Sequence, residues 1–301
     1  MTVEKTARGA LDHKFKPIKK KTAMNKTWFI TGSGSGIGTG IAKAALRAGD
    51  RVVATGRNLE KVRKVFSEVA PENIAFVQLD VASEAQAKTA VDEALKRFGR
   101  IDVLVNNAGY SLLGNFEQMT TAEIQQQFTT NFYGVVHVMQ AALPVMRRQR
   151  SGHIINISSV AGVVGLKHCA AYAATKFAVE GLSLSVATEV EKFGIKITVV
   201  EPGFFRTDLL DAQNVRWVSK IIEDYAPEGT AKDMWSQYDG TQPGDPAKLG
   251  DALVKIAGMP NPPKVFVAGA DARDVITPAI EERLREARAH ETLSKSMAGS
   301  F

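Results

Sequence analysis

The turn that decides the fold reads Thr31-Gly32-Ser33-Gly34-Ser35-Gly36-Ile37-Gly38. It follows the apolar run 27–31 and precedes a stretch in which apolar residues recur three and four positions apart. Glycine lets a backbone approach a pyrophosphate closely and take a positive φ. A helix that starts there offers free N–H groups and a partial positive charge to an anion. An ordinary glycine turn is the alternative, but the strand before it and the helix after it favour dinucleotide binding.

The spacing of this turn is Gly-x3-Gly-x-Gly rather than the common Gly-x-Gly-x-x-Gly. The residues that we expect to contact a dinucleotide here are Gly32, Ser33, Ser35, Gly36, Ile37 and Gly38.

Six more short apolar runs alternate with helical patterns along the chain. They cover residues 51–55, 74–80, 101–106, 153–158, 195–200 and 264–267. Repeated strand–helix–strand units imply right-handed crossovers, and nearly continuous apolar strands imply burial on both faces. The sequence therefore predicts an α/β fold with a doubly wound, mostly parallel, seven-stranded sheet. We expect this Rossmann-like sheet to have helices on both faces and to form a single catalytic domain over residues 24–301.

Two segments depart from this alternation. Residues 207–250 mix aromatic and polar residues after the sixth predicted strand, where a substrate lid would be placed. Residues 273–297 are highly charged and predict a C-terminal helix with Ile276, Ile280 and Leu284 on one face.

Residues 1–23 form a basic segment with seven basic and two acidic side chains, so most of the net charge of +6 lies there. The segment lacks an apolar period, and we interpret it as a flexible N-terminal extension that is dispensable for the fold. Contact with nucleic acid or a membrane surface is the sharper alternative, and an upstream start site is another. Nucleic-acid binding through this segment would weaken steeply with salt.

The composition excludes several classes of protein. Apolar residues make up 45% of the 301 residues, which is enough for a sizeable core and excludes wholesale disorder. We find no apolar run of about 18 residues and no apolar centre near the N-terminus, so we expect no membrane segment and no signal peptide. The single cysteine, Cys169, cannot form an internal disulfide, which favours a reducing, cytoplasmic location.

The second predicted strand bears on the choice of dinucleotide. A site for NAD usually has an acidic residue at the end of this strand. Here Gly56 stands in that place and Arg57 follows it. A guanidinium can pair with a 2′-phosphate, so we expect NADP(H) rather than NAD(H). The alternative is that Arg57 is a solvated loop residue.

Tyr172 and Lys176 are four residues apart in an alanine-rich helical pattern, so their side chains leave one face of a helix. A nearby ammonium stabilises a phenolate and lowers the tyrosine pKa toward the range useful for proton transfer. Ser159 directly follows the apolar run 153–158, at the ligand side of such a sheet. A packed tyrosine beside an exposed lysine, and a turn serine, are the plainer alternatives.

Together, these motifs resemble the short-chain dehydrogenase/reductase family between residues 27 and 207. The resemblance rests on the order and spacing of Thr31-Gly32-x3-Gly36-x-Gly38, Asn106-Asn107-Ala108-Gly109, Asn131, Ser159, Tyr172-x3-Lys176 and Pro202-Gly203.

The resemblance implies a role for each matching residue. Tyr172 would be the general acid/base, Ser159 would polarise the carbonyl group, and Lys176 would bind the nicotinamide ribose. Asn131 would hold a relay water. The remaining cofactor contacts implied are Asp80 and Val81 near the adenine, Asn106, Ala108 and Gly109 in the turn, and Pro202, Gly203 and Thr207 beside the nicotinamide. No role is implied for Glu201.

The predicted function is hydride transfer between NADP(H) and an apolar or amphipathic ketone or secondary alcohol. The candidate substrate walls are Leu112, Leu113, Val163, Val164, Phe204, Phe205, Leu209 and Leu210. The alternative is a nucleotide-binding sensor without relevant turnover. The resemblance also suggests a homodimer or homotetramer that pairs residues 120–149 and 170–193. The five histidines are not spaced as metal ligands, so we expect no metal site.

Overall fold

The computed structural model describes residues 25–207, 214–238 and 240–299. Its main sheet has seven parallel strands in the order β3-β2-β1-β4-β6-β7-β9. The bounds are β1 Thr27–Ile30, β2 Arg51–Gly56, β3 Ile74–Gln78, β4 Val103–Asn106, β6 Gly152–Ile157, β7 Ile195–Pro202 and β9 Val265–Ala268. The predicted fold class is confirmed, and each predicted run overlaps one of these strands, with some ends differing by one or two residues.

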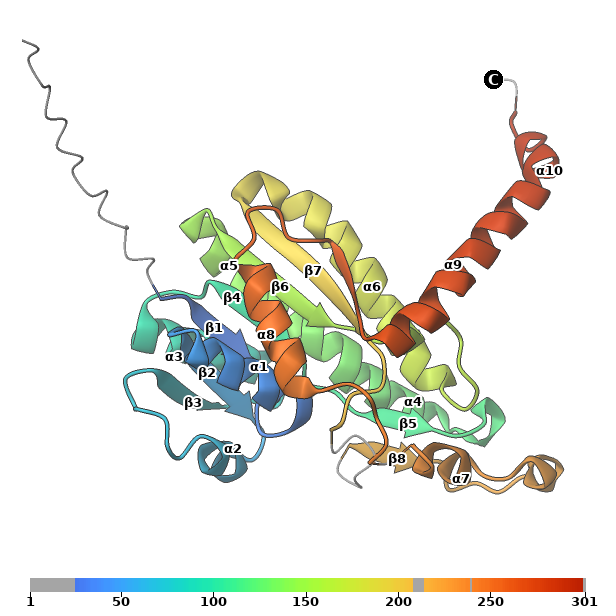
Figure 1. Cartoon of the computed structure of the whole chain (residues 1–301), viewed down its shortest axis with the longest axis horizontal. Coiled ribbons are helices and arrows are strands. Elements are labelled where there is room, and N and C mark those ends of the chain that lie inside the picture. The colour runs from blue at the N-terminus through green and yellow to red at the C-terminus, as the bar shows by residue number, and fades with distance from the viewer. Residues whose placement is uncertain (1–24, 208–213, 239, 300–301) are drawn as a thin grey trace, which may run out of the picture.

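Helices cover both faces of the sheet (Figure 1). One face packs against α1 (Gly36–Arg47), α2 (Leu59–Val65) and α8 (Pro246–Ala257). The other packs against α3 (Glu84–Phe98), α5 (Gly134–Gln149) and α6 (Ala170–Val190). Phe29 and Val53 point into the second core, whereas Trp28 and Val52 point into the first, as strand alternation requires. Burial on both faces is the reason that the strands are nearly all apolar.

Shorter elements connect these layers. The helix α4 (Thr121–Phe128) continues through a π-helical turn, η2 (Thr129–Tyr133), into α5. The 3-10 turns are η1 (Phe116–Gln118), η3 (Val160–Gly162), η4 (Glu191–Phe193) and η6 (Glu223–Glu228).

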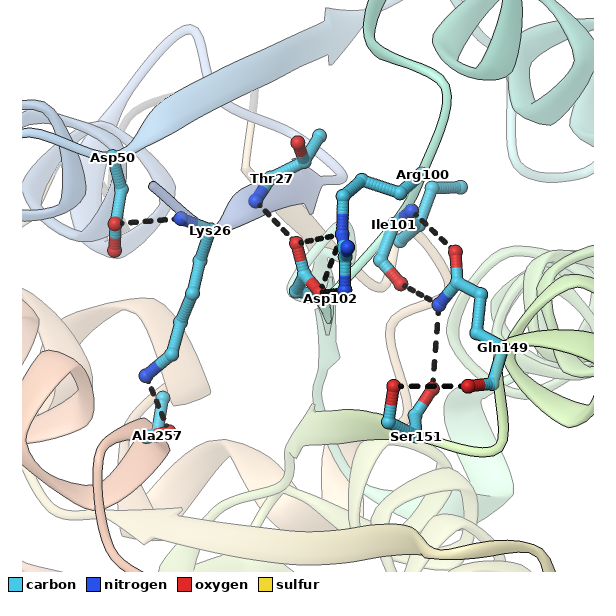
Figure 2. A network of polar contacts seen from close by, with 9 residues as sticks. All are labelled: Lys26, Thr27, Asp50, Arg100, Ile101, Asp102, Gln149, Ser151 and Ala257. Carbon is cyan, nitrogen blue, oxygen red and sulfur yellow. Dashed lines mark hydrogen bonds and ion pairs between the residues drawn. The ribbon is translucent and has the colours of Figure 1, made fainter. Parts of the chain in front are cut away.

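Polar side chains form hydrogen bonds at the amino ends of the central strands (Figure 2). Asp102 accepts a hydrogen bond of 2.8 Å from the Thr27 backbone and pairs with Arg100. Lys26 donates to the backbone oxygen of Ala257 at 2.7 Å, and Gln149 donates to that of Ile101 at 2.8 Å. These bonds fix the strand starts, and the loops at the opposite, carboxyl ends carry the site.

Residues 207–250 contain more regular structure than the sequence predicted. The strand β8 (Val215–Trp217) pairs in parallel with β5 (Ser111–Leu113), and α7 (Ala231–Ser236) follows. Both strands have only three residues, which is too short for a periodic pattern in the sequence. The predicted walls Leu209 and Leu210, like the N-terminal extension, lie outside the described residues.

The predicted C-terminal helix is present as α9 (Ala270–Ala289) and α10 (Glu291–Lys295). The start of α9 packs on the body through Ile276, which is buried, and the rest projects away from it (Figure 1). Ile280 and Leu284 are 55% and 49% exposed, so only one end of the predicted apolar face packs within the chain. None of the described helices is long and apolar enough to cross a membrane.

Candidate active site

A cavity of about 360 Å³ lies at the carboxyl ends of the strands. Its walls come from the turns after β1 to β4, β6 and β7, from α6, and from the segment that contains β8 and α7. Loops at this edge of a doubly wound sheet are where such folds bind ligands.

The glycine-rich turn forms one end of this cavity. Gly32 and Gly36 have φ values of +68° and +53°, which residues other than glycine rarely adopt. A Cβ on Gly32 would lie 3.1 Å from the Ala108 Cα, so the two turns touch through their backbones. Ser35, Gly36 and Ile37 line the cavity at the start of α1, whose first N–H groups have no partner within the helix. The turn is therefore built to receive an anionic group.

Asn107 and Thr31 hold this turn against the end of β4. The Thr31 hydroxyl oxygen accepts hydrogen bonds from the backbone N–H groups of Asn107 and Ala108, at 2.9 and 3.0 Å. The Asn107 side-chain amide donates to the backbone oxygens of Thr31 and Gly32, at 3.0 and 3.2 Å. Sequence reasoning gave Asn107 no role of its own, although it stands second in the Asn-Asn-Ala-Gly motif.

The ends of β2 and β3 form the next part of the wall. Arg57 lies there with Asn58 and Lys61, and Asp80 and Val81 lie after β3. Asn58 caps α2 by accepting a hydrogen bond of 3.0 Å from the Lys61 backbone. The cavity therefore has cationic side chains beside β2, where the sequence showed no acidic residue.

Tyr172, Lys176 and Ser159 meet at the other end of the cavity and all three line it. The Lys176 ammonium nitrogen is 5.6 Å from the centre of the Tyr172 ring and donates a hydrogen bond of 2.8 Å to the Ile157 carbonyl oxygen. The hydroxyl groups of Ser159 and Ser111 interact with the Tyr172 hydroxyl. Ser111 belongs to β5, a strand that the sequence did not predict.

The pKa values of this pair differ from the sequence prediction. Burial raises the pKa of Tyr172 to about 12, against the smaller effect of the Ser159 hydroxyl group, which lowers it. Burial also lowers the pKa of Lys176 to about 8, partly offset by the charge of Glu180. The lysine therefore does not depress the tyrosine pKa within the protein alone. A cationic nicotinamide ring beside the phenol would favour the phenolate.

Four predicted site residues do not line the cavity, although all of them are among the described residues. They are Ser33, Gly38, Asn106 and Asn131. The Ser33 hydroxyl donates to the Ile30 carbonyl oxygen at 2.8 Å, inside the turn. A Cβ on Gly38 would lie 2.3 Å from the Gly32 carbonyl oxygen, so this glycine permits close packing behind the turn.

Asn106 and Asn131 also have structural partners. Asn106 is buried and donates to the Asn156 side-chain oxygen at 2.8 Å, across the β4–β6 pair. Asn131 lies in the π-helical turn, where its side chain accepts from the Tyr110 backbone N–H at 3.1 Å and donates to the Tyr110 carbonyl oxygen at 2.8 Å. Asn131 thus braces Tyr110, which is itself part of the cavity wall.

The remaining predicted cofactor contacts do line the cavity. They are Ala108, Gly109, Pro202, Gly203 and Thr207, with Thr207 beside the glycine-rich turn.

The substrate side of the cavity is apolar and aromatic, and only part of it was predicted. Leu113, Phe204 and Phe205 line it, as do Val215 and Trp235 of the 207–250 segment. The Phe204 ring stacks on Tyr238 at 5.2 Å and contacts Trp235 at 5.7 Å between ring centres.

Three residues that were predicted to line the substrate site pack against other parts of the protein instead. Leu112 packs against Met119 and Ala171, and Val163 and Val164 pack toward Ile276 of α9. Within the described residues, no group of three or more His, Cys, Asp or Glu side chains is placed to hold a metal ion.

Comparison with known proteins assigns the family. A sequence profile described as "short chain dehydrogenase" matches residues 26–216. The chain belongs to the short-chain dehydrogenase family. It is 39% identical over 259 residues to "Oxidoreductase BOA17" of Botryotinia fuckeliana, covering 86% of this chain and 94% of that one. It is also 38% identical over 238 residues to a "3-ketodihydrosphingosine reductase" of Bacteroides thetaiotaomicron, covering 78% and 84%.

Solved structures agree with this short-chain dehydrogenase assignment. A short-chain dehydrogenase from Streptomyces avermitilis superposes with a TM-score of 0.84 at 35% identity, covering 91% of this chain and all of that one. The structure described as "ElxO with NADP Bound" superposes with a TM-score of 0.68 at 32% identity, covering 83% and 98%. The chain is therefore an NAD(P)-dependent oxidoreductase of this family.

Proposed function

We propose that this dehydrogenase transfers a hydride between NADP(H) and an apolar or amphipathic ketone or secondary alcohol. The observation that carries the proposal is that Tyr172, Lys176 and Ser159 share one cavity with the glycine-rich turn. A dinucleotide that lies with its phosphates at the turn would extend toward Tyr172.

The residues of the cavity fit such a cofactor. The turn is a backbone cradle in which a Cβ on Gly36 would lie 3.1 Å from Thr207, so only glycine leaves the start of α1 open. Arg57, which follows β2, would pair with a 2′-phosphate, and Lys176 would bind the ribose of the nicotinamide. The bound cofactor supplies the hydride, and the protein positions and polarises the reactants.

The protein's own groups would complete the reaction. In reduction, the Tyr172 hydroxyl gives its proton to the carbonyl oxygen as the hydride reaches the carbon. The Ser159 hydroxyl donates a hydrogen bond to the oxygen as it becomes negative. Oxidation of an alcohol follows the same path in reverse.

The aromatic wall favours an apolar or amphipathic substrate over a sugar phosphate. Phe204, Phe205 and Trp235 present rings and no charge to this part of the cavity. The name of the Bacteroides relative states that it reduces 3-ketodihydrosphingosine, a ketone with an alkyl chain.

The test is a panel of ketones and alcohols of increasing chain length, assayed with NADPH and NADH. We expect NADPH-dependent turnover of apolar ketones, and a loss of several orders of magnitude in kcat for Tyr172→Phe with little change in NADPH affinity. Tight NADPH binding without turnover of any ketone would instead favour the nucleotide-binding sensor.

We also propose a homodimer or homotetramer formed through α4, α5 and α6. Tyr133 of η2, between α4 and α5, is 50% exposed, and Phe177 and Leu184 of α6 are each 42% exposed, which leaves apolar surface for a second subunit to cover. Light scattering of the wild type and of Leu184→Glu tests this, since a charge at the interface would favour the monomer. The cytoplasmic location stays a prediction from the single cysteine.

A further inference from the structure

Two carboxyl groups, one partly buried and one buried, lie behind the site, and the proposed reaction uses neither. Glu180 is on α6, one helical turn after Lys176. Glu201 lies near the end of β7 and is 4% exposed. Burying a carboxylate is costly unless it is paired or hydrogen-bonded, so the surroundings of these two groups decide their charge.

Ser158 connects Glu180 to the turn that carries Ser159. Its backbone N–H donates to the Val200 carbonyl oxygen at 2.7 Å, which fixes it at the end of β6. A Cβ on Gly162 would lie 2.4 Å from the Ser158 hydroxyl oxygen and 3.3 Å from the Glu180 Oε1. Both oxygens are therefore packed against the bare backbone of η3. Neither oxygen has a partner of good hydrogen-bond geometry within the described residues, and the nearby Ser158 hydroxyl lowers the pKa of Glu180.

Lys176 is the cation whose charge acts on Glu180. The two residues are at i and i+4 on α6, the spacing at which opposite charges attract. Lys176 is only 7% exposed, so its ammonium is poorly solvated, and it donates a hydrogen bond to the uncharged Ile157 carbonyl oxygen. The Glu180 carboxylate supplies the negative charge that favours the ammonium.

Three groups from three elements act on Glu180. Lys176 of α6 and Ser158 at the end of β6 favour its carboxylate, whereas Glu201 of β7 disfavours it. Burial is the largest effect, and together with Glu201 it raises the pKa of Glu180 to about 7. The carboxyl group thus changes charge near neutral pH, next to the lysine of the site.

We infer that Glu180 is a positioning residue for the reaction proposed above. Its carboxyl group holds the Ser158 hydroxyl beneath the Ser159 turn and keeps Lys176 in its charged form. The inference rests on the proposed function for its catalytic meaning, but the link between Glu180 and Lys176 can be measured without turnover.

The direct test is an NMR titration of protein labelled with ¹³C-lysine, in which Lys176→Arg identifies the Lys176 signal. In the wild type we expect the Lys176 pKa near the value of about 8 that its burial gives. In Glu180→Gln it falls by about 1, because the amide fills the same space without the charge. In Glu189→Gln, an exposed position on the same helix, it stays unchanged.

Ser158→Ala is the second variant, and it covers the case that Glu180→Gln fails to fold. It removes the hydroxyl that favours the carboxylate, so the Lys176 pKa falls in the same direction by a smaller amount. An unchanged Lys176 pKa in a folded Glu180→Gln protein, or in Ser158→Ala if that is the variant that folds, overturns the inference.

The activity measurement separates this inference from the proposed function. Turnover by the wild type tests the function, whereas the Glu180→Gln profile tests the positioning role. We expect kcat for alcohol oxidation to fall about tenfold near pH 7.5, with the acid limb of the profile moved to higher pH. A uniform loss at every pH, with the limb in place, would indicate packing alone and contradict the role.

Discussion

Asn107 ties the glycine-rich turn to the end of β4 by donating from its side chain to the backbone oxygen of Gly32, at 3.2 Å. The same amide donates to the Thr31 oxygen at 3.0 Å, so one side chain satisfies two backbone acceptors of the turn. The shape of the anion cradle therefore depends on a residue outside it.

Replacing Asn107 by alanine tests this link. Both carbonyl oxygens lose their donor, which costs about 1–3 kcal/mol in the free energy of unfolding. We expect the dissociation constant for NADPH to rise about tenfold, as the turn loosens. Urea denaturation and fluorescence titration measure the two effects, with the exposed Asn25→Ala as the control. NADPH affinity equal to that of the wild type would show that the turn holds its shape without this bond.

The two asparagines of the motif show what the sequence could and could not predict. Consecutive side chains of an extended chain point to opposite sides, so only one of Asn106 and Asn107 can face the turn. The resemblance marked Asn106, whereas the structure directs Asn106 toward Asn156 and Asn107 toward Gly32. Which of the two asparagine side chains points toward the turn depends on how β4 pairs in register with β6. No local pattern in the sequence predicts that register.

The strands were predictable because each is an apolar run long enough to be buried on both faces. The pair β5–β8 was not, because three residues carry no period and the partner strand is about a hundred residues away. The rise in the Tyr172 pKa without a bound cofactor could not be predicted either, for a related reason. Its rise comes from burial by segments that the sequence keeps far apart, including β5, whereas the i, i+4 lysine was visible at once.

Arg57→Ala tests the cofactor preference. A charge-assisted hydrogen bond to a 2′-phosphate contributes roughly 1.5–3 kcal/mol, so we expect about 10- to 100-fold weaker NADPH binding. Binding of NADH, which lacks that phosphate, should change less than threefold. Isothermal titration with both cofactors measures this, and Lys64→Ala on the exposed side of α2 is the control. Equal NADH and NADPH affinities in the wild type would contradict the NADP(H) preference.

His153 predicts part of the pH dependence of stability. It is buried beside the Thr198 hydroxyl, at 2.8 Å, and burial lowers its pKa from 6.5 to about 4. Since the unfolded chain binds the proton more tightly, this residue's contribution is fully present above pH 6.5 and is lost as the pH falls toward 4. The loss amounts to about 3 kcal/mol at the acid end of that range.

The measurement is urea denaturation of the wild type and His153→Gln at several pH values between 4 and 7. We expect the wild type to lose more stability than the variant over this range, because glutamine does not titrate. Parallel curves for the two proteins would mean that His153 takes up its proton in the folded state.

Trp235→Ala tests the aromatic wall of the substrate site. Its indole ring contacts Phe204 at 5.7 Å between ring centres and covers the cavity from α7. Without the indole ring, part of the alkyl chain of a bound long-chain ketone stays in contact with water. This costs roughly 1–2 kcal/mol of binding free energy. We therefore expect KM for a long-chain ketone to rise about tenfold, whereas kcat and the KM for a short ketone change little, since Tyr172 and Ser159 are untouched. Tyr225→Phe, a change in the same segment at a residue that does not line the cavity, should leave both substrates unaffected. An equal rise in KM for short and long ketones would mean that Trp235 shapes the segment as a whole and does not contact the alkyl chain.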